Sequence, residues 1–314
     1  MTAKVVVVGS LNMDLVVRAP HIPHPGETVI GGEYYTAAGG KGSNQAVAAA
    51  RLGAKVHMVG RVGQDELGVR LMETLEEAGV DHQFVVQDPR ASTGVALITV
   101  ADSGQNTIVV APGSNMRLSP DDVDAARGAI GEADILLVQL ETPLETVTRA
   151  LQIARAKGVK TILNPAPART LPRDIFGLVD VLIPNETETA VLAGLSIATQ
   201  TEAKAAGAAL RKQGVRTVVL TLGERGAVYL DAGDVGALSA YEVKAVDTTA
   251  AGDAFVGAFA VATAEGKSLP EAVRWGNAAG ALAVTKRGAQ PSLPDRGALE
   301  EILAFGAIKP DQGD

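Results

Sequence analysis

Short runs of β-branched and leucine residues alternate along the chain with longer amphipathic stretches. The apolar runs lie at 5–8, 55–59, 135–139, 161–163, 179–183 and 217–222. Runs of this length are typical of strands that are covered on both faces. The stretches between them are rich in helix-forming Ala, Leu, Glu, Arg and Lys, at 42–52, 65–78, 120–130, 144–157, 186–193 and 202–213. This alternation predicts an α/β fold with a doubly wound, mainly parallel sheet flanked by helices.

Two segments break the alternation. Residues 14–35 contain strand-like pieces at 15–17 and 27–30 but no helical pattern, and residues 94–111 resemble a hairpin around a polar loop. We expect residues of about 12–37 and 93–112 to pair as a small β-sheet lid that projects from the core. Its apolar face needs a partner, either a substrate cleft or another subunit, unless the hairpin is an exposed decoration. Since no repeat or long linker divides the chain, residues 1–314 are expected to form one domain.

Composition narrows the class of protein. With 46% hydrophobic residues, the chain of 314 residues can bury enough apolar surface to fold. The net charge of −8 comes without a basic run, which argues against nucleic acid and anionic membranes as partners. The absence of cysteine excludes disulfides, thiolate nucleophiles and cysteine-ligated zinc. The apolar run at 5–8 is too short for a signal peptide and no stretch approaches the ~20 residues of a membrane span, so we expect a cytoplasmic protein.

Several common nucleotide and metal motifs are absent. The chain has no G-x-x-x-x-G-K-[ST] sequence, and no complete G-x-G-x-x-G sequence follows the first predicted strand. It also has no H-E-x-x-H sequence, and its four histidines are scattered. These absences argue against a P-loop, a dinucleotide fingerprint and a zinc site.

The strongest candidate for chemistry lies at residues 246–255, where small residues precede an Ala-rich helix with Gly252 at its opening. Free backbone amides and the helix dipole make such a start an anion site. Asp253 in the first turn would lie beside a bound phosphate, in a position that suits a general base for an attacking hydroxyl. Alternatively, Asp253 is only a favourable charge at a helix N-terminus.

Two further polar stretches point to a polyhydroxylated ligand. In the Gly-rich turn at 38–46, Lys41 and Asn44 are three residues apart and can reach one ligand, unless the glycine is only a helix cap and the lysine only solvated. Directly after the first strand, extended backbone would place Asn12 and Asp14 on one face, where they can bond sugar hydroxyls unless they are ordinary turn formers.

Residues 183–188 turn from a strand into a helix with two carboxylates in the first turn. A capping box explains them structurally, and a Mg²⁺–water site explains them functionally. Together, the four stretches place polar groups at the carboxyl ends of strands, the edge at which open α/β sheets bind ligands.

The chain resembles the ribokinase-like carbohydrate kinases. Residues 39–44 and 247–253 are similar to the two signatures of this family, and residues 185–188 are similar to its N-x-x-E element. The resemblance extends from Gly9 to Ser292. Stretches similar to the members that phosphorylate ribose lie at 12–14, 139–141, 164–168 and 288–292. The resemblance implies ATP-dependent phosphorylation of D-ribose at O5 with Mg²⁺ and K⁺. Kinases of fructose or deoxyribose in the same family are the alternative.

The resemblance also implies roles for individual residues. Asp253 matches the catalytic base, and the backbone of Ala250, Ala251 and Gly252 matches an anion hole. The matching sugar positions are Asn12, Met13, Asp14, Gly40, Lys41, Gly42, Ser43, Asn44, Glu141 and Asp253, with Ala96 and Val110 from the lid. The matching ATP positions are Asn185, Thr221, Leu222, Gly223, Glu224, Arg225, Gly226, Gly252 and Asn277. The K⁺ positions are Asp247, Thr249, Ala283, Lys286, Gly288 and Ser292, and Glu188 orients Mg²⁺ through water. Members of the family commonly form homodimers through their lid sheets.

Two rival functions belong to other classes. A nicotinamide-dependent oxidoreductase would use the same fold, but the dinucleotide fingerprint is missing after the first strand. A non-catalytic sugar sensor would bind the same ligand, but it would have no need for the intact Gly252 and Asp253.

Overall fold

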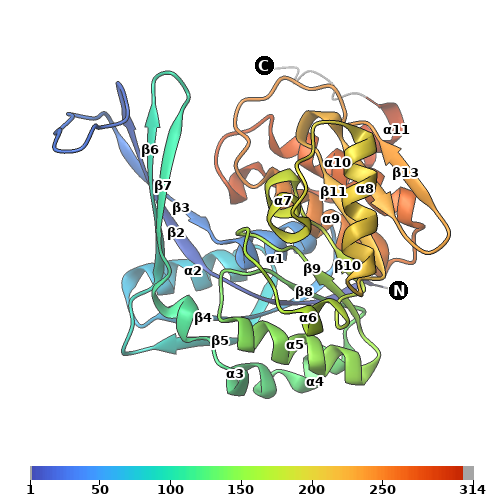
Figure 1. Ribbon diagram of the computed structural model, residues 1–314. Coiled ribbons are helices and arrows are strands. Elements are labelled where there is room, and N and C mark those ends of the chain that lie inside the picture. The colour runs from blue at the N-terminus through green and yellow to red at the C-terminus, as the bar shows by residue number, and fades with distance from the viewer. Residues whose placement is uncertain (1, 307–314) are drawn as a thin grey trace.

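The computed structural model describes residues 2–306, in which a nine-stranded sheet runs through the core in the order β13-β12-β11-β10-β9-β8-β1-β4-β5 (Figure 1). From β5 to β11 all neighbouring strands are parallel, and β12 and β13 extend the sheet as antiparallel neighbours. The strands are β1 (Lys4–Val8), β4 (Lys55–Gly63), β5 (Val80–Asp88), β8 (Ile135–Val138), β9 (Lys160–Leu163), β10 (Val181–Leu182), β11 (Thr217–Thr221), β12 (Ala227–Leu230) and β13 (Val235–Leu238). The predicted α/β fold class is confirmed.

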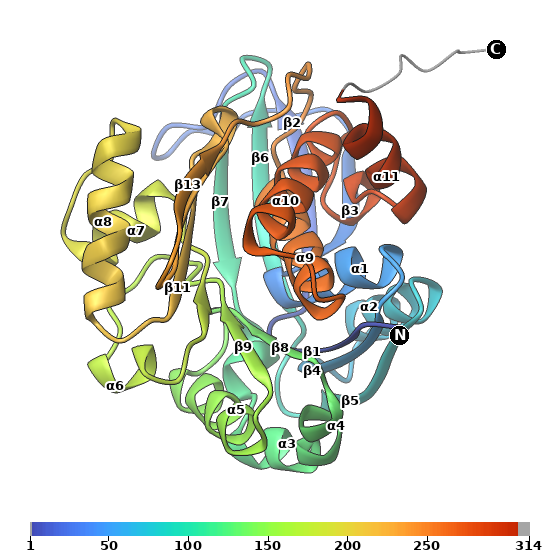
Figure 2. The ribbon, with the colours of Figure 1, turned by 90° about the vertical axis from the view of Figure 1, so that its right-hand side faces the viewer.

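Helices cover both faces of this sheet. One face carries α1 (Lys41–Arg51), α2 (Glu66–Glu77), α9 (Ala251–Ala264), α10 (Leu269–Ala283) and α11 (Arg296–Phe305). The other carries α3 (Pro120–Ala125), α4 (Arg127–Glu132), α5 (Leu144–Lys157), α6 (Arg173–Phe176), α7 (Glu186–Ala193) and α8 (Gln200–Lys212) (Figure 2). In β1, Val5 and Val7 pack into the first cluster and Val6 and Val8 into the second. Side chains alternate across a strand, so a strand buried on both faces must be apolar at every position.

A separate four-stranded sheet projects from the core as the lid (Figure 1). Its order is β3 (Tyr34–Gly39), β2 (Asn12–Ala19), β6 (Gly94–Ala101) and β7 (Asn106–Ala111). The predicted hairpin is confirmed, but the expected strand at 27–30 is wrong, because β3 pairs with β2 in its place. The Glu27 carboxylate instead accepts hydrogen bonds from His24 N and the His21 ring, which folds this segment into a turn.

Other boundaries also differ from the prediction. The expected helix at 120–130 is divided at Ala126, which ends α3 and begins α4. Of the expected strand at 179–183, only Val181–Leu182 forms ladder pairs. The alternation did not predict strands β5, β12 and β13, or helices α6, α10 and α11. Among residues 2–306, no helix combines the length and apolar character that crossing a bilayer requires.

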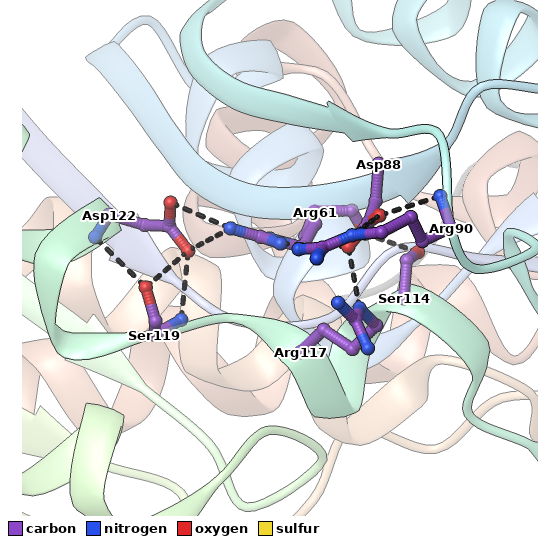
Figure 3. A network of polar contacts seen from close by, with 7 residues as sticks. All are labelled: Arg61, Asp88, Arg90, Ser114, Arg117, Ser119 and Asp122. Atoms are coloured by element: carbon purple, nitrogen blue, oxygen red, sulfur yellow. Dashed lines mark hydrogen bonds and ion pairs between the residues drawn. The ribbon is translucent and has the colours of Figure 1, made fainter.

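A buried ionic cluster joins the base of the lid to the core (Figure 3). Arg61 of β4 donates to Asp88, which ends β5, at 2.8 Å, and to both carboxylate oxygens of Asp122 in α3. Arg117, at the end of the 3-10 helix η1 (Gly113–Arg117), donates to the same Asp88 oxygen at 2.7 Å. Hydrogen bonds from Arg117, Arg90 and Arg61 hold the pKa of the Asp88 carboxyl well below its usual range. The strand that returns from the lid is therefore anchored as soon as it reaches the core.

Candidate active site

The Asp253 carboxylate lies in the first turn of α9 and is only 7% exposed. Asn44 Nδ2 donates to its Oδ2 at 2.9 Å, and Gln45 Nε2 donates to its Oδ1 at 2.9 Å. Burial raises the pKa of Asp253, against the opposing effects of the Lys41 charge and these two hydrogen bonds. A buried carboxylate held by two amides and still near a cationic side chain has the properties of a general base.

Helix α1 reaches Asp253 because it packs unusually close to α9. A Cβ added at Gly257 of α9 would lie 2.6 Å from Ala48 Cβ, and within 3.1 Å of the Gln45 carbonyl oxygen. The small residues of the two helices therefore allow the approach that brings Asn44 and Gln45 against the carboxylate. The Ala-rich composition of both segments thus has a function in the site as well as in helix formation.

The start of α9 has a backbone that suits an anion hole. Ala250 caps the helix at φ 58° and is, within residues 2–306, the only non-glycine residue with positive φ. This left-handed conformation costs an L-residue about 1–2 kcal/mol, and such strain is concentrated at functional sites. A Cβ added at Gly252 would have no atom within 4 Å, so this turn opens onto empty space.

The Lys41 side chain lies within electrostatic range of three carboxylates, those of Asp253, Glu141 and Glu188. Its backbone N donates to Glu141 Oε2 at 3.0 Å, and Ser10 Oγ donates to the same oxygen. Burial lowers the pKa of the Lys41 ammonium, but Asp253, Glu141 and Glu188 together outweigh this and raise it. Burial, with Glu141 and Asp253, raises the pKa of Asp14 to about 7. The cluster therefore combines one cation with several acceptors, as recognition of a polyol requires.

The lid contributes one row of side chains to this site. Asp14 of β2 pairs with Ala96 of β6, which in turn pairs with Val110 of β7. Paired residues share a face, so the predicted polar contact and the two predicted apolar contacts lie side by side. Val110 is 45% exposed, whereas Ala96 is 6% exposed.

Two predicted sugar positions have side chains that are engaged elsewhere. Met13 alternates with Asn12 and Asp14 and packs into the core. Ser43 Oγ accepts a hydrogen bond from Gln290 Nε2 at 2.7 Å and is buried. The glycines Gly40 and Gly42 bring α1 against the link after β1, since a Cβ at Gly42 would lie 2.6 Å from Ser10 N. The side chains of Met13 and Ser43 are therefore not free to contact a ligand.

A cavity of about 1040 Å³ lies against the start of α9, and none of its lining residues comes from the strands of the lid. Of the predicted ATP positions, it is lined by Asn185, Thr221, Gly223, Glu224, Arg225, Gly226, Gly252 and Asn277. Leu222 is buried and does not line it. Apolar walls come from Val243, Phe255 and Val284 among others. A space of this size, apolar with a few polar groups, suits a nucleotide.

Three of the predicted monovalent-cation positions, Asp247, Thr249 and Gly288, are joined by hydrogen bonds between the loop before α9 and the loop after α10. Asp247 Oδ1 accepts from Thr249 N at 2.9 Å and from Thr249 Oγ1 at 2.6 Å, and its Oδ2 accepts from Gly288 N at 2.9 Å. Burial raises the pKa of Asp247, but these bonds and Arg287 outweigh it and lower it. The 288–292 segment is fixed to α1 because Arg51 donates to the Gln290 and Leu293 carbonyls.

The capping box predicted for residues 185–188 is confirmed. The Asn185 side chain accepts from Glu188 N at 2.8 Å, and Glu188 Oε2 accepts from Asn185 N at 2.8 Å. Burial raises the pKa of Glu188, although the Asn185 bond and Lys41 oppose it. In the described part of the chain, no cluster of three or more His, Cys, Asp or Glu side chains could hold a metal directly.

The sequence pattern missed a second layer of amides behind Asp253. Gln45 Nε2 also donates to Asn164 Oδ1 at 3.0 Å, and Gln45 Oε1 accepts from Gln139 Nε2 at 2.6 Å. Asn164 in turn donates to the Ile183 carbonyl at 2.9 Å. Gln139, Asn164 and Ile183 follow β8, β9 and β10, so the ends of three neighbouring strands support the Asp253 carboxylate through Gln45. In the sequence, the only signal for the contacts of Gln139 and Asn164 with Gln45 is that both residues directly follow apolar runs.

Nearly the whole chain is similar to known carbohydrate kinases. A model of the pfkB family of carbohydrate kinases matches residues 2–296. The ribokinase of Haemophilus influenzae is 44% identical over 305 residues, which are 97% of this chain and 99% of that protein. The deoxyribokinase of Salmonella typhi is 36% identical over 302 residues, 96% of this chain and 99% of that protein.

The chain is also similar in fold to solved structures of ribokinases. The structure of Arabidopsis thaliana ribokinase complexed with ribose and ATP is 36% identical, with a TM-score of 0.90, over 97% of this chain and all of that chain. The ribokinase structure from Thermotoga maritima is 37% identical with a TM-score of 0.87, over 97% of this chain and all of that chain. By sequence over nearly its full length and by fold, this chain belongs to the pfkB family of carbohydrate kinases.

Proposed function

We propose that this protein is an ATP-dependent ribokinase that converts D-ribose and ATP to D-ribose 5-phosphate and ADP. One observation carries the proposal: the buried Asp253 lies at the start of α9, between the sugar-binding polar cluster and the nucleotide cavity. A hydroxyl placed on the lid side and a phosphate placed at the helix start would meet at this carboxylate.

The chemistry follows from this placement. Asp253 takes the proton of the ribose O5 hydroxyl while O5 bonds to the γ-phosphorus, and the bond from that phosphorus to the β–γ bridging oxygen breaks. The amides at Ala250, Ala251 and Gly252 stabilise the transferring group, since phosphoryl transfer depends on positioning and charge neutralisation. The lid row of Asp14, Ala96 and Val110 covers the sugar and keeps water from the γ-phosphate.

The choice of sugar rests on the relatives. The proteins named ribokinase in Haemophilus influenzae and Staphylococcus aureus are 44% and 40% identical to this chain, whereas the Salmonella typhi deoxyribokinase is 36% identical. That last likeness makes deoxyribose the second candidate substrate. Coupled ADP-release assays with D-ribose, 2-deoxy-D-ribose and D-fructose test the proposal, and D-ribose is expected to have the highest kcat/KM. Higher kcat/KM with another sugar would overturn it.

Mg²⁺ is the proposed companion of ATP. Carboxylate oxygens and water are the ligands that Mg²⁺ prefers, and it usually keeps several waters. Glu188 fits an indirect role, because its carboxylate is buried, lies near Lys41 and Asp253, and retains lone pairs beyond those used in the capping box. When bound, Mg²⁺ supplies positive charge to the phosphates.

Activation by K⁺ is the first prediction. Asp247 with Thr249 and the backbone of Ala283, Lys286, Gly288 and Ser292 provide carboxylate and carbonyl oxygens, which suit a hard monovalent cation. A cation there would stiffen the loop that leads into α9 and raise the positive potential at the anion hole. We expect kcat to be higher in KCl than in NaCl, and the difference to disappear in Asp247→Ala. Equal turnover of the unsubstituted protein in both salts would contradict the site.

Dimerisation through the lid sheets is the second prediction. Leu97, Ile108 and Val109 are 50%, 55% and 64% exposed, and every residue of the edge strand β7 is exposed. An exposed apolar edge strand favours pairing with another chain. Light scattering is expected to give a mass near twice 32.1 kDa, and Val109→Glu is expected to shift it toward the monomer. A monomeric unsubstituted protein at micromolar concentration would refute this assembly.

A further inference from the structure

Asn115 is a buried amide outside the set of residues that the family motifs identify. It lies in η1, where β7 returns to the core, and is 1% exposed. Its Oδ1 accepts from Leu11 N at 2.9 Å, and its Nδ2 donates to the Leu11 carbonyl at 3.0 Å and to Asn12 Oδ1 at 2.7 Å. The side chain therefore clamps the short link between β1 and β2 by three hydrogen bonds.

The third of these bonds determines how Asn12 faces the site. An Asn side chain has one acceptor oxygen and one donor nitrogen group, and they point in different directions. Because Asn12 Oδ1 is turned toward Asn115, its Nδ2 is left as the polar group for a ligand. No group within residues 2–306 accepts a hydrogen bond from this Nδ2, although Asn12 is only 3% exposed.

The arrangement requires a glycine opposite the two amides. Gly94 begins β6 and pairs with Asn12. A Cβ added there would lie 2.2 Å from Asn12 Oδ1 and 2.3 Å from Asn115 Nδ2. The absence of this side chain leaves the space in which the two amides meet.

The ionic cluster of Figure 3 holds η1 in place on both sides of Asn115. Before it, Ser114 Oγ donates to the Arg61 carbonyl at 3.0 Å and Ser114 N donates to the Ser92 carbonyl at 2.8 Å. After it, Arg117 donates to Asp88, which also binds Arg61. Asn115 is thus attached to a rigid part of the core and not to the projecting part of the lid.

We propose that Asn115 is a positioning residue that fixes Asn12 as a hydrogen-bond donor, so that the enzyme selects a sugar with a hydroxyl oxygen at that point. The inference rests on the proposed function, in which Asn12 contacts the sugar. A free amide could turn over to meet either a donor or an acceptor. The clamp removes this freedom before the sugar arrives, and pre-organised groups bind with less loss of entropy.

Asn115→Asp tests the proposal with an almost isosteric change. The new carboxylate still accepts from Leu11 N, but it has no N–H for the Leu11 carbonyl or for Asn12 Oδ1, so Asn12 is expected to turn its Nδ2 away from the sugar. We expect the KM for D-ribose to rise by about 10-fold or more, as for a lost hydrogen bond that leaves a polar group unpaired, with the KM for ATP nearly unchanged. Asn106→Asp, on exposed β7, is the matched control for added charge and should keep both KM values.

Deoxy analogues of D-ribose give a second readout that a merely structural defect would not reproduce. In the unsubstituted protein, one analogue should have a markedly higher KM than D-ribose, and in Asn12→Ala this difference should vanish. If Asn115→Asp abolishes the same difference, the positioning role is supported. If it retains the difference, or raises both KM values in proportion to a loss of thermal stability, the proposal is overturned.

Arg117→Leu is a second test of the proposal, which can be used if Asn115→Asp does not fold. Arg117 is 40% exposed at its side chain and touches no proposed ligand, so its loss should loosen η1 with less damage. It is expected to raise the KM for D-ribose in the same direction as Asn115→Asp and to leave that for ATP unchanged; an unchanged KM for D-ribose would contradict the proposal. If the unsubstituted protein is inactive toward D-ribose, the proposed function itself is refuted. If it is active and the variants keep its KM for D-ribose, only the positioning role fails.

Discussion

Replacing Asp253 by Asn is expected to lower kcat by about 10²–10⁴-fold, the usual loss when a general base is removed. The amide has nearly the shape of the carboxylate but cannot take the proton of the attacking hydroxyl. The KM values for sugar and ATP should change little, because the contacts of Lys41 and the nucleotide cavity remain. Steady-state kinetics by ADP release, with circular dichroism to verify folding, measure this effect.

Asp295→Asn is the matched control for the alternative interpretation, in which Asp253 serves only as a favourable helix charge. Asp295 caps α11, where its Oδ1 accepts from Ala298 N at 2.9 Å, and it lies away from the site. If capping and dipole effects were the whole role of Asp253, the two variants would lose similar amounts of stability and both would keep their turnover. A near-normal kcat in Asp253→Asn would therefore rule out the role of Asp253 as a general base.

Gly40→Ala is expected to reduce the free energy of unfolding by about 3 kcal/mol or more, from backbone strain together with steric overlap. Gly40 caps α1 at φ 90° and ψ 131°, a conformation that L-residues rarely adopt. Its Cβ would lie 2.7 Å from Asn12 N and 3.0 Å from the Ser10 carbonyl oxygen, both backbone atoms that cannot move aside. The change should displace α1 from the link after β1 and raise the KM for sugar. Urea denaturation and kinetics measure the two effects.

Gly252→Ala is expected to lower kcat without lowering the free energy of unfolding, in contrast to Gly40→Ala. Its Cβ meets no atom within 4 Å, and alanine favours a helix over glycine by roughly 0.5–1 kcal/mol, so stability should be kept or slightly improved. The same methyl group projects toward the space proposed for the transferring phosphate, so kcat should fall. An unchanged kcat in this variant would argue against an anion hole at Gly252, and an unchanged stability in Gly40→Ala would contradict the strain argument.

The sequence predicted those parts of the fold that depend on local rules. The apolar run Val5–Val8 indicated a strand covered on both faces, and helix α5 was predicted at its observed bounds, Leu144–Lys157. The strand expected at 27–30 was wrong because pairing with β2 selects Tyr34–Gly39, and a strand partner is a long-range property. The pattern also missed β12 and the edge strand β13, and β13 joins the sheet only through its pairing with β12, which is again a long-range property.

The candidate site divides in a similar way. Asp253 and the Gly-rich turn at Gly40 could be identified from the chain alone, because a helix start, a glycine and a nearby carboxylate have local chemical meaning. The resemblance to the carbohydrate kinases added roles for these residues, and the family assignment is confirmed. By contrast, Gln45 and Asn115 have no local signal, because an amide acquires its role only from the partner that folding brings to it.

By itself, then, the amino-acid order determined an α/β core with a projecting sheet, and the helix start that carries the Asp253 carboxylate. Only the tertiary structure decided which side chains hold that carboxylate and which amide orients Asn12. The physical reason is range: periodicity and capping act over a few residues, whereas Asn115 meets Asn12 across 103 positions and Asn44 meets Asp253 across 209.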